Sequence, residues 1–154
     1  MVNFFKRLFG KNKPSQNEPI GKEKLMRPHF TDKEAIAMGR LAVSIVGSRI
    51  NQPEAMIKFS YEYEGYTVGD LKSMTNMGMP DFLDSISIFS QMTDPLKKTY
   101  AAGFFAAIVK ACHAENDAQI LIAYHNCVEQ MLKINGMEDI NVAANYYEGF
   151  EHGK

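Results

Sequence analysis

Apolar side chains recur every three or four residues along most of this chain, the spacing of one face of an α-helix. The first clear run follows Thr31, which forms a capping-box sequence with Glu34 and predicts the start of a helix there. The buried face of this helix is expected to hold Ile36, Gly39, Val43, Val46 and Ile50. A second helix is predicted over residues 53–64, because Pro53 suits a first turn and Gly65 suits a helix end. Its expected inner face comprises Met56, Phe59 and Tyr63.

The middle of the chain is less regular. Residues 66–79 contain two candidate caps, Thr67 and Asp70, for a short helix through Met77. Pro80 then opens another helix. The side chains expected to point inward from that helix are Phe82, Ile86 and Phe89.

The second half of the chain has the strongest helical pattern. Thr93 is the predicted cap of a long helix over residues 94–114. Its apolar face has residues four positions apart, namely Leu96, Tyr100, Phe104 and Ile108. Asn116 is the predicted cap of the next helix, which Asn135 and Gly136 end, and a last helix covers about residues 137–150. The apolar face of the helix after Asn116 comprises Ile120, Tyr124, Cys127, Met131 and Ile134.

Together these patterns predict an all-α fold of about seven helices packed as antiparallel hairpins. No alternating strand pattern bounded by turns is present in the sequence. The length of 154 residues suits one domain, and 45% hydrophobic residues are enough for a packed core. We therefore expect a single all-helical domain over residues 25–154.

The residues before this domain have a different character. Residues 1–10 form a short, basic, amphipathic segment, and residues 11–24 are a polar linker with two prolines. Lys6 and Arg7 lie off the apolar face of the segment. That face comprises Phe4, Phe5, Leu8 and Phe9. Residues 1–13 carry a charge of +4 from four basic side chains, whereas the rest of the chain has 13 basic and 18 acidic side chains, or −5.

An aromatic face beside a basic flank is typical of a helix that lies in the headgroup region of an anionic membrane. The same segment also suits docking on a protein groove, and a terminus without a role is the third alternative. No apolar run is long enough to span a membrane, and no signal-peptide core is present. Two cysteines and no signal peptide indicate a reducing compartment, so a cytoplasmic protein is expected. If residues 1–10 contact a membrane, the protein is peripheral to the inner membrane.

Two histidines and two cysteines, Cys112, His113, His125 and Cys127, have the composition of a zinc site. Their positions argue against one, because the side chains of adjacent helical residues diverge by about 100° and Cys127 lies roughly 10 Å along the hairpin from the partner of Cys112. The same offset argues against a disulfide. The cysteines are therefore interpreted as buried apolar side chains and the histidines as incidental.

Other chemistry has little support. The sequence contains no nucleophile elbow and no glycine-rich phosphate loop, so we expect neither an enzyme nor a nucleotide-binding protein, and no cofactor. A net charge of −1 predicts no nucleic-acid partner. Methionines around residues 74–79 suit flexible core filling or an adaptable groove for a partner helix. The tyrosine- and glutamate-rich stretches 61–66 and 146–148 are interpreted as solvated helix faces in preference to binding sites.

Two helix–loop–helix segments share a longer pattern. Residues 46–54, VGSRINQPE, and residues 111–119, ACHAENDAQ, flank a middle segment. The arrangement resembles the TerB-like (tellurite-resistance) helical family, whose loops follow A-D-G-x-[IV]-x-x-x-E. Ile50 and Glu54 match this pattern in the first loop. Gly47-Ser48 and Cys112-His113 stand where the family has Asp-Gly, and Gln119 replaces the final acid.

The resemblance implies the helical scaffold and a non-catalytic role in stress response at the membrane face. In the family the acidic loops gather a metal ion, so the weak metal-ligand candidates here are Glu54, which matches, and the neighbouring Glu115 and Asp117. The leading hypothesis is a TerB-like interaction module with an unknown protein partner, held near the inner membrane by Phe4, Phe5, Lys6, Arg7, Leu8 and Phe9. A self-assembling homo-oligomer and a divalent-ion sensor are the alternatives.

Overall fold

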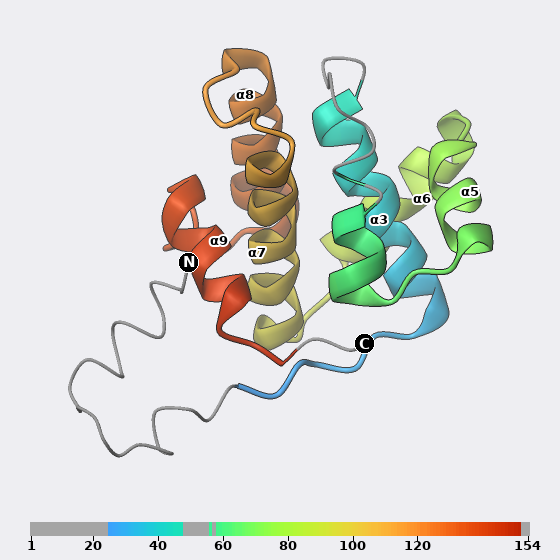
Figure 1. The fold of residues 1–154 in the computed structure, drawn as a ribbon, viewed down its shortest axis with the longest axis horizontal. Coiled ribbons are helices and arrows are strands. Elements are labelled where there is room, and N and C mark those ends of the chain that lie inside the picture. The colour runs from blue at the N-terminus through green and yellow to red at the C-terminus, as the bar shows by residue number, and fades with distance from the viewer. Residues whose placement is uncertain (1–24, 48–55, 57, 152–154) are drawn as a thin grey trace.

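The computed structural model describes residues 25–47, 56 and 58–151. These residues form a single all-α domain, as predicted (Figure 1). Its elements in chain order are α3 (Asp32–Val46), the π-helix η2 (Ser60–Glu64), α5 (Val68–Thr75), α6 (Met79–Ser90), α7 (Pro95–Ala111), α8 (Ala118–Asn126), the π-helix η3 (Cys127–Leu132) and α9 (Ile140–Glu148). Residues 1–24 and the first loop with Ile50, Pro53 and Glu54 lie outside the described residues.

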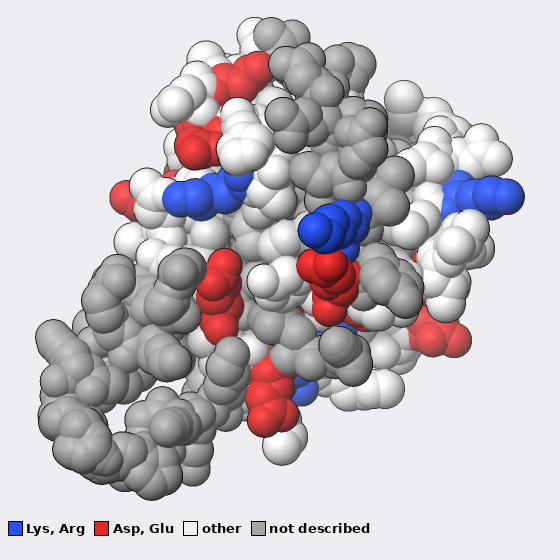
Figure 2. Space-filling view, viewed as in Figure 1, with Lys and Arg blue, Asp and Glu red and all other residues white. Residues whose placement is uncertain are grey.

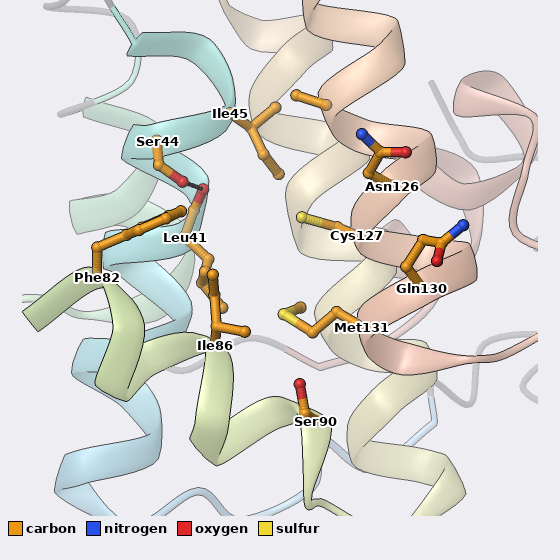
Figure 3. Close-up of a pocket in the computed structure, with 11 residues that line it drawn as sticks. Leu41, Ser44, Ile45, Phe82, Ile86, Ser90, Asn126, Cys127, Gln130 and Met131 are labelled. Atoms are coloured by element: carbon orange, nitrogen blue, oxygen red, sulfur yellow. Dashed lines mark hydrogen bonds between the residues drawn. The ribbon is translucent and has the colours of Figure 1, made fainter. Parts of the chain in front are cut away.

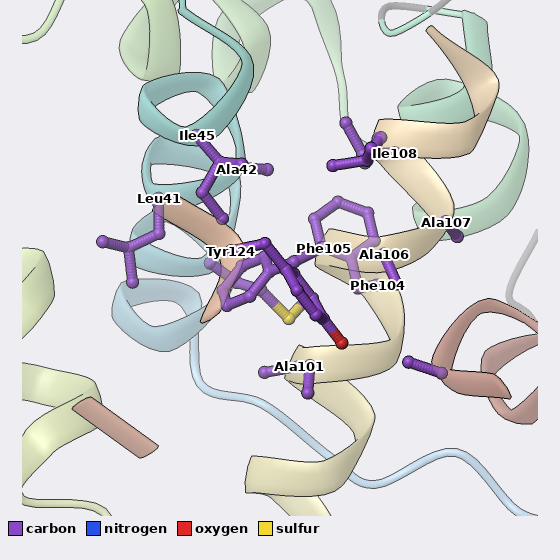
Figure 4. Close-up of a cluster of buried hydrophobic side chains, with 14 of the residues drawn as sticks. Leu41, Ala42, Ile45, Ala101, Phe104, Phe105, Ala106, Ala107, Ile108 and Tyr124 are labelled. Carbon is purple, nitrogen blue, oxygen red and sulfur yellow. The ribbon is translucent and has the colours of Figure 1, made fainter. Parts of the chain in front are cut away.

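Helix α7 runs through the centre of the domain. Every residue from 100 to 109 is buried, because α9 packs along one side of this helix and α3 along another (Figures 1 and 4). Close packing is aided by Gly103, where a Cβ atom would lie 2.9 Å from Cβ of Tyr147 and 3.1 Å from the carbonyl oxygen of Ala143. A helix that is apolar on all sides belongs in the interior of a domain.

Several predicted helix starts are confirmed. Thr31 and Glu34 form the capping box of α3, and Thr67 caps α5 through a second capping box with Asp70. Pro80 lies in the first turn of α6. These caps satisfy amide groups that have no partner inside the helix. Because each capping box pairs residues only three positions apart, its position could be predicted from the local sequence.

Two predicted caps are wrong by one residue. Asp94, not Thr93, accepts the amide proton of Leu96 at the start of α7. Asp117, not Asn116, accepts the amide protons of Gln119 and Ile120 at the start of α8. A carboxylate is a stronger acceptor than a hydroxyl or an amide and also favours the positive end of the helix dipole.

The inward faces and helix ends also differ in part from the predictions. Leu96 is 42% exposed, because the first turn of α7 extends beyond the core. The helix that begins at α8 continues as η3 and ends at Leu132, where Lys133 adopts the left-handed conformation that was expected of Asn135 or Gly136. The last helix, α9, begins only at Ile140, after its cap Asp139.

The two ends of the described domain meet. Leu25 forms an isolated parallel bridge with Phe150, in which its amide donates to Gly149 and its carbonyl accepts from the amide of Glu151. The chain therefore enters the domain beside the end of α9, at the lower edge of Figure 1.

The surface of the described residues carries charges of both signs. On the face shown in Figure 2, acidic and basic side chains are interspersed, and no broad patch of one sign forms among the described residues. None of the described helices combines the length and apolar character that crossing a membrane requires.

Candidate functional site

A groove of about 410 Å³ lies between α3, α6 and the continuous α8–η3 segment (Figure 3). Most of its surface is apolar, and no charged side chain lines it. The lining residues are Leu41, Ser44, Ile45, Phe82, Ile86, Ser90, Ala123, Asn126, Cys127, Gln130 and Met131. We refer to this feature as the α3–α6–η3 groove.

Helices α3 and α6 form one side of the groove. Leu41 and Ile45 of α3 are almost fully buried beneath it, so they form its floor. Phe82 and Ile86 of α6 were predicted to point into the core; they pack against it but stay partly exposed, and they also line the groove. Phe89, the third predicted residue of that face, is fully buried. Helix α6 is therefore fully covered at Ser85 and Phe89, whereas Phe82 and Ile86 remain partly exposed at the groove.

The opposite side of the groove comes from α8 and η3. Cys127 and Met131 point from η3 toward α3 and α6 (Figure 3). The π-helix begins at Cys127, and the wider turn changes which side chains face the groove from that point on. Burial raises the pKa of the Cys127 thiol to about 11, so at neutral pH this side chain is an uncharged, apolar part of the wall.

Polar groups of the groove are few and uncharged. The Ser44 hydroxyl donates a hydrogen bond to the carbonyl oxygen of Leu41 at 2.8 Å, so it is already satisfied within α3. Asn126 and Gln130 are exposed and leave their amide groups at the edge. Leu83 and Ile122, each 56% exposed, stand on the same two helices and extend their apolar surface outward. The groove thus suits an apolar surface with a few hydrogen-bonding groups at its border.

A buried cluster of polar side chains lies away from the groove. The side chain of Glu64, at the end of η2, has no exposed surface. One carboxylate oxygen accepts hydrogen bonds at 2.5 Å from the hydroxyls of Tyr100 and Tyr147, and the other pairs with the Arg27 guanidinium. Arg27 also donates to the Tyr100 hydroxyl at 3.2 Å. We call Arg27, Glu64, Tyr100 and Tyr147 the Glu64 cluster.

Burial and the neighbouring carboxylate stabilise the neutral tyrosines of this cluster. Burial is the largest cause that raises the pKa of Tyr100 and of Tyr147, and the negative charge of Glu64 raises both further. The cluster joins residues just after the linker to α7, α9 and η2. It therefore fixes the point at which the N-terminal segment leaves the domain.

This cluster corrects the interpretation of the tyrosine-rich stretches as solvated faces. Tyr66 and Tyr147 are buried, and the Tyr66 hydroxyl donates to the carbonyl oxygen of Ala35 at 2.8 Å. No local feature of the sequence marked Glu64 as buried, because its position directly after Tyr63 and before Gly65 also suits an exposed acid at a helix end. An acid at such a position is buried only when donors from other helices reach it.

Of the predicted site residues, the described structure contains only Glu115 and Asp117. Phe4, Phe5, Lys6, Arg7, Leu8, Phe9 and Glu54 lie outside the described residues. Asp117 caps α8, and one carboxylate oxygen of Glu115 is buried without a hydrogen-bond partner among the described residues. No group of three or more His, Cys, Asp or Glu side chains within the described residues is arranged to hold a metal ion.

The cysteines and histidines behave individually. Cys112 and Cys127 are both free, and burial raises the pKa of the Cys112 thiol to about 11 as well. His125 forms a hydrogen bond of 2.9 Å with the carbonyl oxygen of Glu138, and His113 has a positive φ of 54° at the end of α7. A buried thiol with a raised pKa is a poor nucleophile at neutral pH.

The α3–α6–η3 groove was not predicted from the sequence, which placed four of its lining residues, Phe82, Ile86, Cys127 and Met131, on inward helix faces. The only sequence feature that pointed to the groove was the apolar character of two helix faces. Apolar faces that are buried in the core have the same character, so the sequence could not distinguish the two. Comparison of the chain with protein-family models, with curated proteins and with solved structures finds no match.

Proposed function

We propose that this protein is a non-catalytic helical interaction module that receives the apolar face of a partner's amphipathic helix in the α3–α6–η3 groove. Residues 2–10 hold it at the cytoplasmic face of an anionic membrane. The observation that carries the proposal is the groove itself, an apolar depression of about 410 Å³ between helices with no charged lining residue.

The shape and chemistry of the groove support a helical partner. Amphipathic helices bind in apolar grooves through side chains at positions i, i+3, i+4 and i+7. The floor from Leu41 and Ile45 and the walls from Phe82 and Met131 offer aliphatic, aromatic and thioether contacts. Thioether side chains adapt to the shape of different partners. The amides of Asn126 and Gln130 can pair with polar groups at the border of such a helix.

The membrane part of the proposal rests on the sequence. Phe4, Phe5, Leu8 and Phe9 provide an apolar face, and Lys6 and Arg7 flank it. A short segment of this kind gives weak and reversible attachment that depends on anionic lipid. The likeness to TerB-like proteins suggests the same setting, with a role in stress response.

Flotation with vesicles tests the membrane attachment. We expect the full chain to float with phosphatidylglycerol vesicles at low salt, and not with phosphatidylcholine vesicles, because the attraction is partly electrostatic. The Phe4→Asp, Phe5→Asp double variant should stay at the bottom, whereas Asn3→Asp, which adds a charge off the apolar face, should still float. Equal flotation of all three chains would contradict attachment through this face.

Titration with a model helix tests the groove. The probe is a labelled synthetic amphipathic peptide with leucine and phenylalanine at i, i+3, i+4 and i+7, observed by NMR shifts of the full chain. We expect shifts concentrated at Ile45, Ile86 and Met131. Ser44→Phe, which fills the groove, should weaken binding at least tenfold, and Ser73→Phe on the exposed surface of α5 should not. Equal binding by both variants would exclude the groove as the site.

A further inference from the structure

We propose that, away from a membrane, the α3–α6–η3 groove is occupied by residues 2–10 of the same chain. This inference rests on the proposed function, since it takes the groove to be a receptor for an amphipathic helix. It adds that the membrane and the groove compete for the same apolar face, which comprises Phe4, Phe5, Leu8 and Phe9.

The dimensions of segment and groove agree. As the helix that its sequence predicts, residues 2–10 would be about 12 Å long at a rise of 1.5 Å per residue. The groove residues Phe82 and Ser90 on α6 are eight positions apart, as are Ala123 and Met131 on the opposite wall. Each wall is therefore also about 12 Å long.

The chemistry agrees as well. The groove has no charged lining residue, so three phenylalanines and a leucine can enter it without burying an unpaired charge. Lys6 and Arg7 lie off the apolar face and stay in solvent. The segment 1–13 carries +4 and the remainder of the chain carries −5, which favours their association.

The linker is long enough to reach. Its C-terminal end is fixed at the domain, because Leu25 pairs with Phe150 and Arg27 is held in the Glu64 cluster. Residues 11–24 provide 14 residues, which span at most about 48 Å and on average roughly 20 Å. A domain of this size has a radius of gyration of about 14 Å. The tether gives an effective concentration on the order of 1 mM, so an intrinsic Kd of ~0.1 mM keeps the segment docked in about nine-tenths of the molecules.

Docking in cis has a consequence for partner binding. A partner helix must displace residues 2–10, so its apparent affinity is reduced when no membrane is present. Anionic lipid holds the same apolar face and leaves the groove open. The segment would thereby restrict partner binding to the membrane surface.

Tryptophan fluorescence tests the inference, because the chain has no tryptophan of its own. Phe5→Trp in the full chain places a single reporter on the apolar face. In buffer we expect a blue-shifted emission and protection from iodide that do not change with protein concentration. Adding Ser44→Phe should shift the emission to that of tryptophan in water, and adding Ser73→Phe should leave it blue-shifted. Gln130→Lys is the second groove variant. Gln130 is exposed, so the substitution should not disturb folding, and the new lysine places a positive charge beside the basic docked segment and should also release the reporter.

Four results would overturn the inference. A water-exposed reporter in the parent chain excludes docking. A buried reporter that neither groove variant releases places the segment elsewhere, and burial that depends on protein concentration places it on a second copy. Adding phosphatidylglycerol vesicles should raise the affinity for the model peptide at least tenfold, and no change would contradict the competition.

Failure of this inference differs from failure of the proposed function. If the reporter is exposed but the parent chain binds the model peptide in the groove, the inference fails and the proposed function stands. If the reporter is buried and released by Ser44→Phe, but a Phe5→Asp, Leu8→Asp chain binds no peptide, the groove serves only the segment and the proposed function fails.

Discussion

Glu64 is a buried carboxylate whose position depends on residues far away in the sequence. Its donors, Tyr100, Arg27 and Tyr147, are 36, 37 and 83 residues distant. Local pattern therefore could not reveal that this acid is buried, although it did locate Gly65 as the residue that ends the helix. Prediction from sequence succeeded for single residues whose role is local, such as Thr31 and Thr67, and failed where the partners are distant.

Removing the Glu64 carboxylate should destabilise the fold. Glu64→Ala leaves Arg27, partly buried, and the hydroxyls of Tyr100 and Tyr147 without their acceptor. Because an unpaired buried charge is costly, we expect the free energy of unfolding to fall by about 3–5 kcal/mol, measured by urea denaturation. Glu62→Ala, at an exposed residue paired with Lys58 at 4.0 Å, should change it by less than about 1 kcal/mol. Similar effects of both substitutions would argue against the cluster as a stabilising element.

At the scale of elements, the sequence predicted which segments are helical better than which faces are covered. Starts marked by a cap or a proline were placed within about one residue for α3, α5, α6, α7 and α8. The single apolar face expected for α7 was too narrow, since the helix is enclosed on all sides. The π-helical turns η2 and η3 were not predicted, because their extra residue per turn has no local sequence signature.

Two helical glycines should respond differently to alanine. At Gly103 the added Cβ would meet the backbone of α9, which cannot move aside, so we expect a loss of about 1–3 kcal/mol. At Gly39 it would meet the thioether of Met74, a side chain that can rotate, while alanine gains up to about 1 kcal/mol of helix propensity. Thermal denaturation should therefore rank Gly103→Ala well below Gly39→Ala. The reverse order would show that α7 and α9 are not closely packed at this point.

For the molecule as a whole, the all-α fold followed from composition and periodicity, whereas the candidate site did not. The α3–α6–η3 groove lies where α3, α6 and η3 come together, and its shape depends on how these three helices cross. Helix crossing follows from the fit of many side chains, which no single stretch of sequence contains. The segment of residues 2–10 was predicted from the sequence, and the groove was observed in the structure. The fluorescence experiment tests whether the one binds in the other.

Stability of the whole domain should fall at alkaline pH. Burial raises the pKa of both cysteines from 9.0 to about 11 and also raises that of Tyr124. Groups with a raised folded-state pKa stabilise the fold fully below their unfolded pKa, and this stabilisation is lost as pH rises through the folded value. We therefore expect urea denaturation to show constant stability from pH 7 to 8.5 and a loss of about 1–2 kcal/mol per thiol by pH 10.5. Replacing both cysteines with alanine should reduce this slope, and a flat profile would contradict burial of the thiols.

The pairing of Leu25 with Phe150 places the two ends of the domain side by side, roughly 5 Å apart across one bridge. Ends this close suit circular permutation, in which a short glycine linker joins residues 151 and 25 and new termini open in an exposed turn. Adjacent ends also suit insertion of residues 25–151 into a surface loop of another protein, because the two residues that flank the insertion can stay close together. Residues 25–151 therefore have the geometry of a domain that can be inserted into another protein.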